Sequence, residues 1–206
     1  MLRVLSALTL STVLLGCGDD SSGTGPDQSD VLRVEDYYPL DFANIWRWSN
    51  GEKEVVGLET IDGISYYTVS YNVGFGPYSQ REFIEDGTVN SHYVDGEIVS
   101  VEHILSEPLE PGHKWEDTCY DGKKCIHEIN VIYDEKSTRL GVLTKVIEVL
   151  SSPETSDSRS DSINTRIDLF APNIGHIQTD WVFRSDPDSS FYTPVAEVLS
   201  FSFPDQ

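Results

Sequence analysis

The chain is poor in basic residues, and this deficit restricts its partners. It has 14 Lys and Arg against 35 Asp and Glu, a formal net charge of −21 at pH 7. Nucleic acid and anionic lipid repel such a protein, because the phosphate attraction that drives those associations has the wrong sign. We expect no nucleic-acid partner. An acidic surface is more typical of a solubility device than of a calcium site, and no segment has EF-hand spacing.

The sequence also lacks motifs that carry chemistry. It contains no nucleophile elbow, phosphate loop or dinucleotide fingerprint. His127-Glu128 begins like a zinc-protease helix, but Val131 stands where the second histidine belongs. The 5 histidines never lie at i, i+2 or i+4 from one another, so no local pair chelates a metal. We predict no catalytic residue, no metal site and no cofactor from these patterns.

Long apolar runs are missing as well. The uncharged run from Val4 to Leu15 has 12 residues and follows the single positive charge of Arg3. A membrane-spanning helix needs roughly 20 apolar residues, so this run is too short to remain as a span. The layout is typical of a signal peptide, which is removed from the mature protein.

The end of that run resembles the lipobox of bacterial lipoproteins. Its residues are Leu14-Leu15-Gly16-Cys17. The resemblance implies cleavage before Cys17 and lipidation of its thiol, with acyl chains that hold the protein to a membrane. The alternative is an ordinary signal peptide that contains a cysteine. By the sorting rules of Gram-negative lipoproteins, Gly18 favours the outer membrane, while Asp19 and Asp20 leave open whether the protein faces the periplasm or the cell surface.

These features divide the chain into three parts. Residues 1–16 form the signal peptide, residues 17–33 the lipidated cysteine and a flexible tether, and residues 34–206 a single β domain. The tether has no large apolar residue from 18 to 30, so it cannot bury enough surface to order itself. A flexible chain of this length reaches roughly 20 Å. Within the domain, the polar stretch 151–162 predicts a long loop.

Only 3 cysteines occur, and the two that follow Cys17 are close together. Cys119 and Cys125 flank Asp121-Gly122, a strong hairpin signal. In an oxidising compartment this spacing predicts a disulfide across the hairpin. A metal site that adds His127 is the alternative, but it lacks a further ligand nearby.

The domain alternates apolar and polar residues with the two-residue period of half-buried strands. Ile167 and Leu169 alternate with Arg166 and Asp168, for example. Four Asp-Gly pairs, at 62–63, 86–87, 95–96 and 121–122, separate such runs and predict tight hairpin turns. We therefore predict an all-β fold, an antiparallel meander of about a dozen strands that forms a curved sheet or open barrel. The expected strands are 44–49, 54–61, 65–73, 79–85, 89–94, 98–105, 114–118, 126–133, 142–150, 163–169, 177–183 and 196–203.

Two segments resemble a large group of mostly uncharacterised bacterial lipoproteins. Tyr38-Pro39-Leu40 with Asn44, Trp46 and Trp48 resembles the group's Y-P-L-x-x-G-N-x-W-x-Y opening, and residues 170–177 resemble its Y-A-P-G-V-G-L-V segment. Ala43 and Asn173 stand where the group has glycine. The resemblance implies an all-β fold, and it implies no activity.

A possible ligand-binding set comes from the aromatic residues and one histidine. Tyr67, Tyr71 and Phe75 belong to an aromatic cluster around a Gly-Phe-Gly-Pro loop, and alternation puts His103 on the row of Leu105. The cluster is either core plus turn, or a stacking platform for a sugar or another flat ligand at a barrel mouth. His103 is either a hydrogen-bonded core residue or a pocket group. Trp181 completes the set.

We interpret the chain as a cell-envelope lipoprotein whose domain is a non-enzymatic binding or scaffold module. Its partners would be the membrane, through the lipid anchor, and an envelope protein or a small apolar ligand. The alternative is a hydrolase of envelope or extracellular polymers. An apolar interior lined by Tyr67, Val69, Trp181 and Phe183 would favour the first reading, and a cleft that joins a histidine to acids would favour the second.

Overall fold

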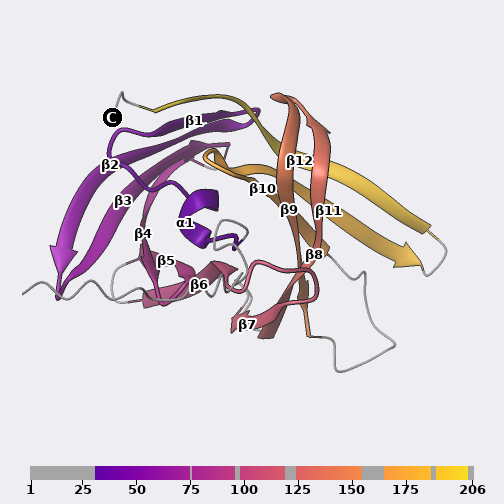
Figure 1. The fold of residues 1–206 in the computed structure, drawn as a ribbon, viewed down its shortest axis with the longest axis horizontal. Helices are drawn as coiled ribbons and strands as arrows, with labels where there is room; N and C mark the ends of the chain where they lie inside the picture. The colour runs from indigo at the N-terminus through magenta and orange to yellow at the C-terminus, as the bar shows by residue number, and fades with distance from the viewer. Residues whose placement is uncertain are drawn as a thin grey trace, which may run out of the picture. The chain divides into compact units, whose positions relative to one another are not determined.

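We describe a computed structural model of the chain (Figure 1). Its described residues are 31–74, 76–95, 98–118, 124–154, 165–186 and 189–203. The chain divides into Met1–Val31 and a compact unit, Leu32–Gln206, which carries the fold. Within the described ranges, no helix has the length and apolar character needed to cross a membrane.

The compact unit contains one sheet of antiparallel strands, which confirms the predicted all-β meander. The order across the sheet is β6-β5-β4-β3-β2-β1-β12-β11-β10-β9-β8-β7. The strands are β1 (Ile45–Trp48), β2 (Gly51–Ile61), β3 (Ile64–Val73), β4 (Gly76–Glu85), β5 (Thr88–Asp95), β6 (Ile98–Ser106), β7 (Lys114–Thr118), β8 (Lys124–Thr138), β9 (Gly141–Pro153), β10 (Thr165–Ala171), β11 (Gly175–Asp186) and β12 (Ser189–Ser202). The predicted polar loop begins later than expected, because Ser151–Pro153 continue β9; residues 155–164 lie outside the described ranges.

The sheet curls until its two edge strands meet, forming a nearly closed barrel with one seam between β6 and β7 (Figure 1). Side chains rather than a backbone ladder link these edges. The His103 N–H donates to Asp117 Oδ2 at 2.6 Å, and the Trp115 indole N–H donates to the His103 carbonyl at 2.8 Å. The seam therefore has specific contacts although the two strands do not pair.

Two of the predicted Asp-Gly turns have the backbone that a tight hairpin needs. Asp62 and Gly63 have φ of 52° and 87°, and Asp86 and Gly87 have 48° and 68°. Two successive positive φ values are the signature of a type I′ turn, which matches the twist of the strands it joins. The other two pairs include residues outside the described ranges.

A short helix, α1 (Val34–Tyr37), lies inside the curve of the sheet (Figure 1). Val34 and Tyr37 are buried in the main hydrophobic cluster. The Tyr37 hydroxyl donates to the Lys145 carbonyl at 2.7 Å, and the Val34 N–H donates to Glu107 Oε1 at 3.1 Å. The helix thus fills the barrel at the end where β6 finishes and β9 begins. With four residues, it is too short to show a helical period in the sequence.

The two segments of the family resemblance contact each other beside α1. The Trp46 indole N–H donates to the Ile174 carbonyl, which lies 128 residues along the chain. A Cβ added to Gly175 would lie 3.3 Å from Pro39 Cδ, so the backbone there approaches the proline ring closely. Both segments therefore serve to close this end of the barrel.

Candidate functional site

A row of mostly polar side chains runs around the inner face of the barrel. Residues that pair directly across strands share a face of the sheet, and the register links Tyr67 to Glu82 and then to Ser91 and Glu102. Beyond the seam it links Trp115, His127, Ser151, Arg166 and Trp181. This face is the inner one, because the core residues Val69 and Ile129 follow two positions after Tyr67 and His127. We call these residues the polar belt: Tyr67, Glu82, Ser91, Glu102, Trp115, His127, Ser151, Arg166 and Trp181.

The first charged centre of the belt surrounds Glu82, which is fully buried. Lys53 Nζ lies 3.1 Å from Glu82 Oε2 and donates to the Tyr38 hydroxyl at 2.8 Å, and the Tyr71 hydroxyl donates to the other Glu82 oxygen. Burial lowers the pKa of Lys53, and the Glu82 carboxylate opposes that shift. The carboxylate thereby keeps a cation in a water-poor interior.

Aromatic faces enclose the same ammonium. Lys53 Nζ lies 4.4 Å from the ring centre of Tyr38, 5.1 Å from that of Trp46 and 5.5 Å from that of Tyr71. Ring faces at these distances attract a cation. Burial raises the pKa of the Tyr38 and Tyr71 hydroxyls well above 10, and nearby Glu82 raises it further. Both hydroxyls therefore stay protonated; that of Tyr71 donates to Glu82, and that of Tyr38 accepts from Lys53.

Arg166 is the second charged centre. It joins Glu102 on β6, at Nη2–Oε1 2.7 Å, to Asp168 on its own strand, at Nε–Oδ2 2.7 Å. The other Asp168 oxygen accepts from Thr179 Oγ1 at 2.8 Å and lies 3.1 Å from His176 Nε2. Arg166 and these partners outweigh the burial of Asp168 and hold the pKa of its carboxyl well below the usual range, while Asp168 raises the pKa of Arg166.

His127 lies in the belt next to these charges. Its Nδ1 is 2.8 Å from Ser151 Oγ, while its Nε2 is buried and has no hydrogen-bond partner in the described part of the chain. The ring stacks on Trp115, with centres 5.3 Å apart and planes at 11°. Burial lowers the pKa of His127, and the positive charge of Arg166 lowers it further. The ring is therefore neutral at pH 7 and presents one unsatisfied nitrogen.

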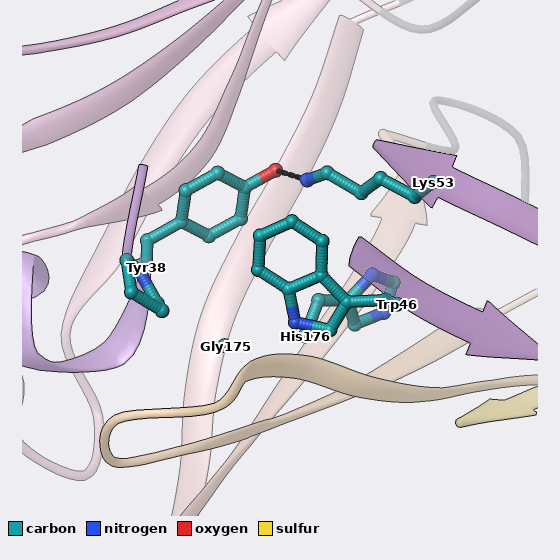
Figure 2. Close-up of a pocket in the computed structure, with 6 residues that line it drawn as sticks. Tyr38, Trp46, Lys53, Gly175 and His176 are labelled. Atoms are coloured by element: carbon teal, nitrogen blue, oxygen red, sulfur yellow. Dashed lines mark hydrogen bonds between the residues drawn. The ribbon is translucent and has the colours of Figure 1, made fainter. Parts of the chain in front are cut away.

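A cavity of about 10 Å³ adjoins the Lys53 centre, and Figure 2 shows its lining. In this view the Lys53 ammonium reaches the Tyr38 hydroxyl, with the Trp46 indole beside both. The lining residues are Tyr38, Pro39, Trp46, Lys53, Gly175 and His176. This volume accommodates about one water molecule. It is too small for a lipid chain or another apolar ligand.

The structure places the sequence-predicted ligand residues in different environments. Tyr67, Tyr71 and Trp181 face inward, in or beside the polar belt. Phe75 lies outside the described residues. His103 was expected on the row of Leu105, and this is wrong: a register shift pairs Asn90 with His103 and Val89 with Leu105. The extra residue between them turns His103 to the outer face, while Glu102 faces the interior.

The cysteine predictions stay open. Cys17 and Cys119 lie outside the described residues, whereas Cys125 is buried on β8, opposite Asp117 of β7. The disulfide therefore remains a prediction.

Sequence reasoning missed Lys53 and the charged members of the belt, Glu82, Glu102 and Arg166. The chain has 35 acidic residues, so no single acid stands out, and neither basic residue belongs to a recognisable motif. The available signal was their place in the alternation: Arg166 lies on the face of the buried Phe170, four positions further along β10. Leu169, on the other face, belongs to a second apolar cluster with Val146 and Ile177.

Comparison with known proteins adds only distant likenesses. No family model matches the chain, and no curated protein matches it. The chain is similar to the crystal structure of a candidate lipoprotein from Parabacteroides distasonis, with a TM-score of 0.48 and 9% identity over 80% of this chain and 97% of that one. It is also similar to a candidate exported protein with a YmcC-like fold from Bacteroides fragilis, with a TM-score of 0.48 and 10% identity over 81% of this chain and 99% of that one.

Proposed function

We propose that the chain is a lipid-anchored protein of the bacterial cell envelope whose barrel acts as a non-enzymatic binding module. The anchor rests on the lipobox-like residues Leu14 to Cys17 and on the apolar run before them. A tether of small and polar residues follows, and the compact unit begins at Leu32. Gly18 supports sorting to the outer membrane.

The point where the tether joins the barrel supports a binding role for the opposite end. Leu32 lies two residues before α1, which fills one end. The antiparallel strands β3, β5 and β9 run away from α1, so their last residues lie at the other end, whereas β6 and β10 run toward α1. That end is the one remote from the attachment point, and it is available to an envelope partner.

The ion pairs of Arg166 are the observation that favours binding over catalysis. Its guanidinium pairs with both Glu102 and Asp168, and Asp168 has further partners in Thr179 and His176. A general base needs a pKa near the operating pH, but these partners hold the pKa of Asp168 far lower. Asp168 is thus suited to holding Arg166, Thr179 and His176 in place rather than to taking up a proton.

A hydrolase is the second candidate, because one histidine does lie beside an acid. His176 Nε2 is 3.1 Å from Asp168 Oδ1 and 3.0 Å from Thr179 Oγ1. The same nitrogen is also 3.0 Å from the Gln178 carbonyl, so it is already engaged by three groups. If His176→Gln abolished turnover of an envelope polymer by the purified protein, the hydrolase would replace the binding module.

Mass analysis of protein extracted from membranes tests the anchor. The expected amino-terminal peptide begins at Cys17 and carries a diacylglyceryl group with or without a third acyl chain. The Cys17→Ala variant should keep residues 1–16 and lose the lipid mass. An unmodified cysteine in the wild-type chain, or a chain that begins at Met1, would contradict the anchor.

A further inference from the structure

A ladder of three tyrosines on the inner face leads from Tyr71, beside Glu82, to the surface near the ends of β4 and β5 that are remote from α1. Tyr71 and Tyr78 stack with ring centres 4.9 Å apart and planes at 4°, and Tyr78 meets Tyr93 edge to face at 6.3 Å. They come from the neighbouring strands β3, β4 and β5. Tyr93 is 38% exposed, so the ladder ends at solvent.

The Glu102–Arg166 pair lies next to this ladder. Ser91, two residues before Tyr93 on the same face, pairs directly with Glu102. The Glu102 and Arg166 side chains are 42% and 29% exposed, whereas Lys53 and Asp168 are 6% exposed. This pair is therefore the part of the charged network that a ligand can reach.

His127 supplies an independent sign that a polar partner is missing. It is 3% exposed, and its Nε2 has no partner among the described residues. Ser151 separates it from Arg166 in the belt, by direct pairing on both sides. A buried polar atom without a hydrogen bond costs about 1–3 kcal/mol. A hydroxyl group or a water held by a ligand at this end would satisfy it.

We propose that this end of the barrel binds a neutral pyranose saccharide, with Tyr78 and Tyr93 against the sugar face and Glu102 and Arg166 on its hydroxyls. The proposal rests on the binding function above and names its ligand class. A pyranose ring has an apolar face that fits an aromatic side chain, and its hydroxyls suit planar charged partners. Few polar groups beside an aromatic wall are typical of small-molecule sites.

Charge selects a neutral sugar over an acidic polymer. The chain carries a net charge of −21, and two carboxylates, Glu102 and Asp168, already share the one guanidinium of Arg166. An anionic ligand would compete with both for the same cation. A neutral ring avoids this repulsion and can still donate hydrogen bonds to Glu102.

Titration calorimetry of the full chain in detergent tests the proposal, with N,N′-diacetylchitobiose and maltose as probes. We expect at least one probe to bind, and Tyr78→Ala and Glu102→Gln each to weaken it at least about tenfold. The matched controls are Tyr66→Ala, a half-buried tyrosine on the outer face of β3, and Glu128→Gln, from the surface pair with Lys114. These should change the affinity less than about twofold.

Glu102→Gln also removes a partner of Arg166, so Tyr93→Ala at the exposed end of the ladder provides a second variant with an intact ion pair. It should weaken binding without lowering the melting temperature. The saccharide site would be overturned if neither probe bound at millimolar concentrations. It would also be overturned if Tyr78→Ala and Tyr93→Ala left the binding affinity unchanged. Mass analysis of Cys17 is independent of this result, so failure of the anchor and failure of the site are distinguishable.

Discussion

Lys53 and Glu82 form an ion pair inside the barrel, with Nζ 3.1 Å from Oε2 and side-chain exposures of 6% and 0%. Loss of the lysine would leave a buried carboxylate without its cation. We expect Lys53→Met to lower the free energy of unfolding by about 3–5 kcal/mol. Urea titration of the full chain measures this loss.

The surface pair Arg81–Glu59 is the control for that experiment. Its atoms are 3.5 Å apart and its side chains are 50% and 58% exposed, so Arg81→Met should cost less than about 1 kcal/mol. The double variant Lys53→Met/Glu82→Leu should recover much of the stability lost in the single one, because no unpaired charge remains. Equal small losses for Lys53→Met and Arg81→Met would contradict the buried pair.

Ala43 has a φ of 67°, in the left-handed region that favours glycine. For a residue with a Cβ, this conformation costs about 1–2 kcal/mol of conformational free energy. We expect Ala43→Gly to stabilise the protein by up to about 1 kcal/mol, once the extra freedom of glycine in the unfolded chain is subtracted. The control is Ala171→Gly, in the buried end of β10, which should be destabilising. A loss of stability in Ala43→Gly would mean that the turn tolerates alanine without strain.

The strands were predictable from the sequence because their signals are local. Alternation is read within a few residues, and Asp62-Gly63 and Asp86-Gly87 mark their turns directly. The polar belt was not predictable in this way. Lys53 and Glu82 are 29 residues apart in the sequence, and Arg166 and Glu102 are 64 residues apart. Contacts between residues so far apart depend on how the sheet curls and closes.

Local irregularities account for the remaining errors. One extra residue on β6 puts His103 and Leu105 on opposite faces of the sheet. The two-residue period of the sequence does not reveal such a bulge. The predicted alternation on β10 is present in the structure, but alternation alone does not tell that Arg166 faces inward while Leu169 joins an apolar cluster on the opposite face. The barrel has packed surface on both faces of this strand.

We expect the free energy of unfolding to decrease in mild acid because His127 becomes protonated more readily in the unfolded chain. Burial and Arg166 lower the pKa of its ring in the folded state, with Glu102 and Asp117 partly opposing them. The unfolded chain therefore binds a proton more readily below about pH 6.5, and the stabilisation present above that value is lost as the pH falls. The slope is at most about 1.4 kcal/mol per pH unit for one proton.

His127→Gln should flatten this dependence between about pH 7 and 5, where the histidine titrates. Urea titrations at several pH values measure it. Asp168→Asn should act in a lower window, because its folded pKa is depressed and its contribution is lost only below about pH 4. An unchanged slope in His127→Gln would assign the acid sensitivity to other groups.

The predicted disulfide has its own test. Protein extracted without reductant should contain no free thiol at Cys119 or Cys125, as measured by alkylation and mass analysis. The Cys119→Ser/Cys125→Ser double variant should be less stable by about 2 kcal/mol, the loop-closure value for so short a loop. Complete alkylation of both thiols in native material would contradict the bond and the oxidising compartment it implies.

Hydrogen–deuterium exchange of the acylated full chain, with and without N,N′-diacetylchitobiose or maltose, tests most directly whether the end remote from α1 is a saccharide site. The predicted result is slower amide exchange in β4, β5, β6 and β10, near Tyr78, Tyr93, Glu102 and Arg166, with α1 and the β8–β9 hairpin unchanged. Protection confined to α1 and that hairpin, or no protection with either sugar at millimolar concentrations, would contradict it.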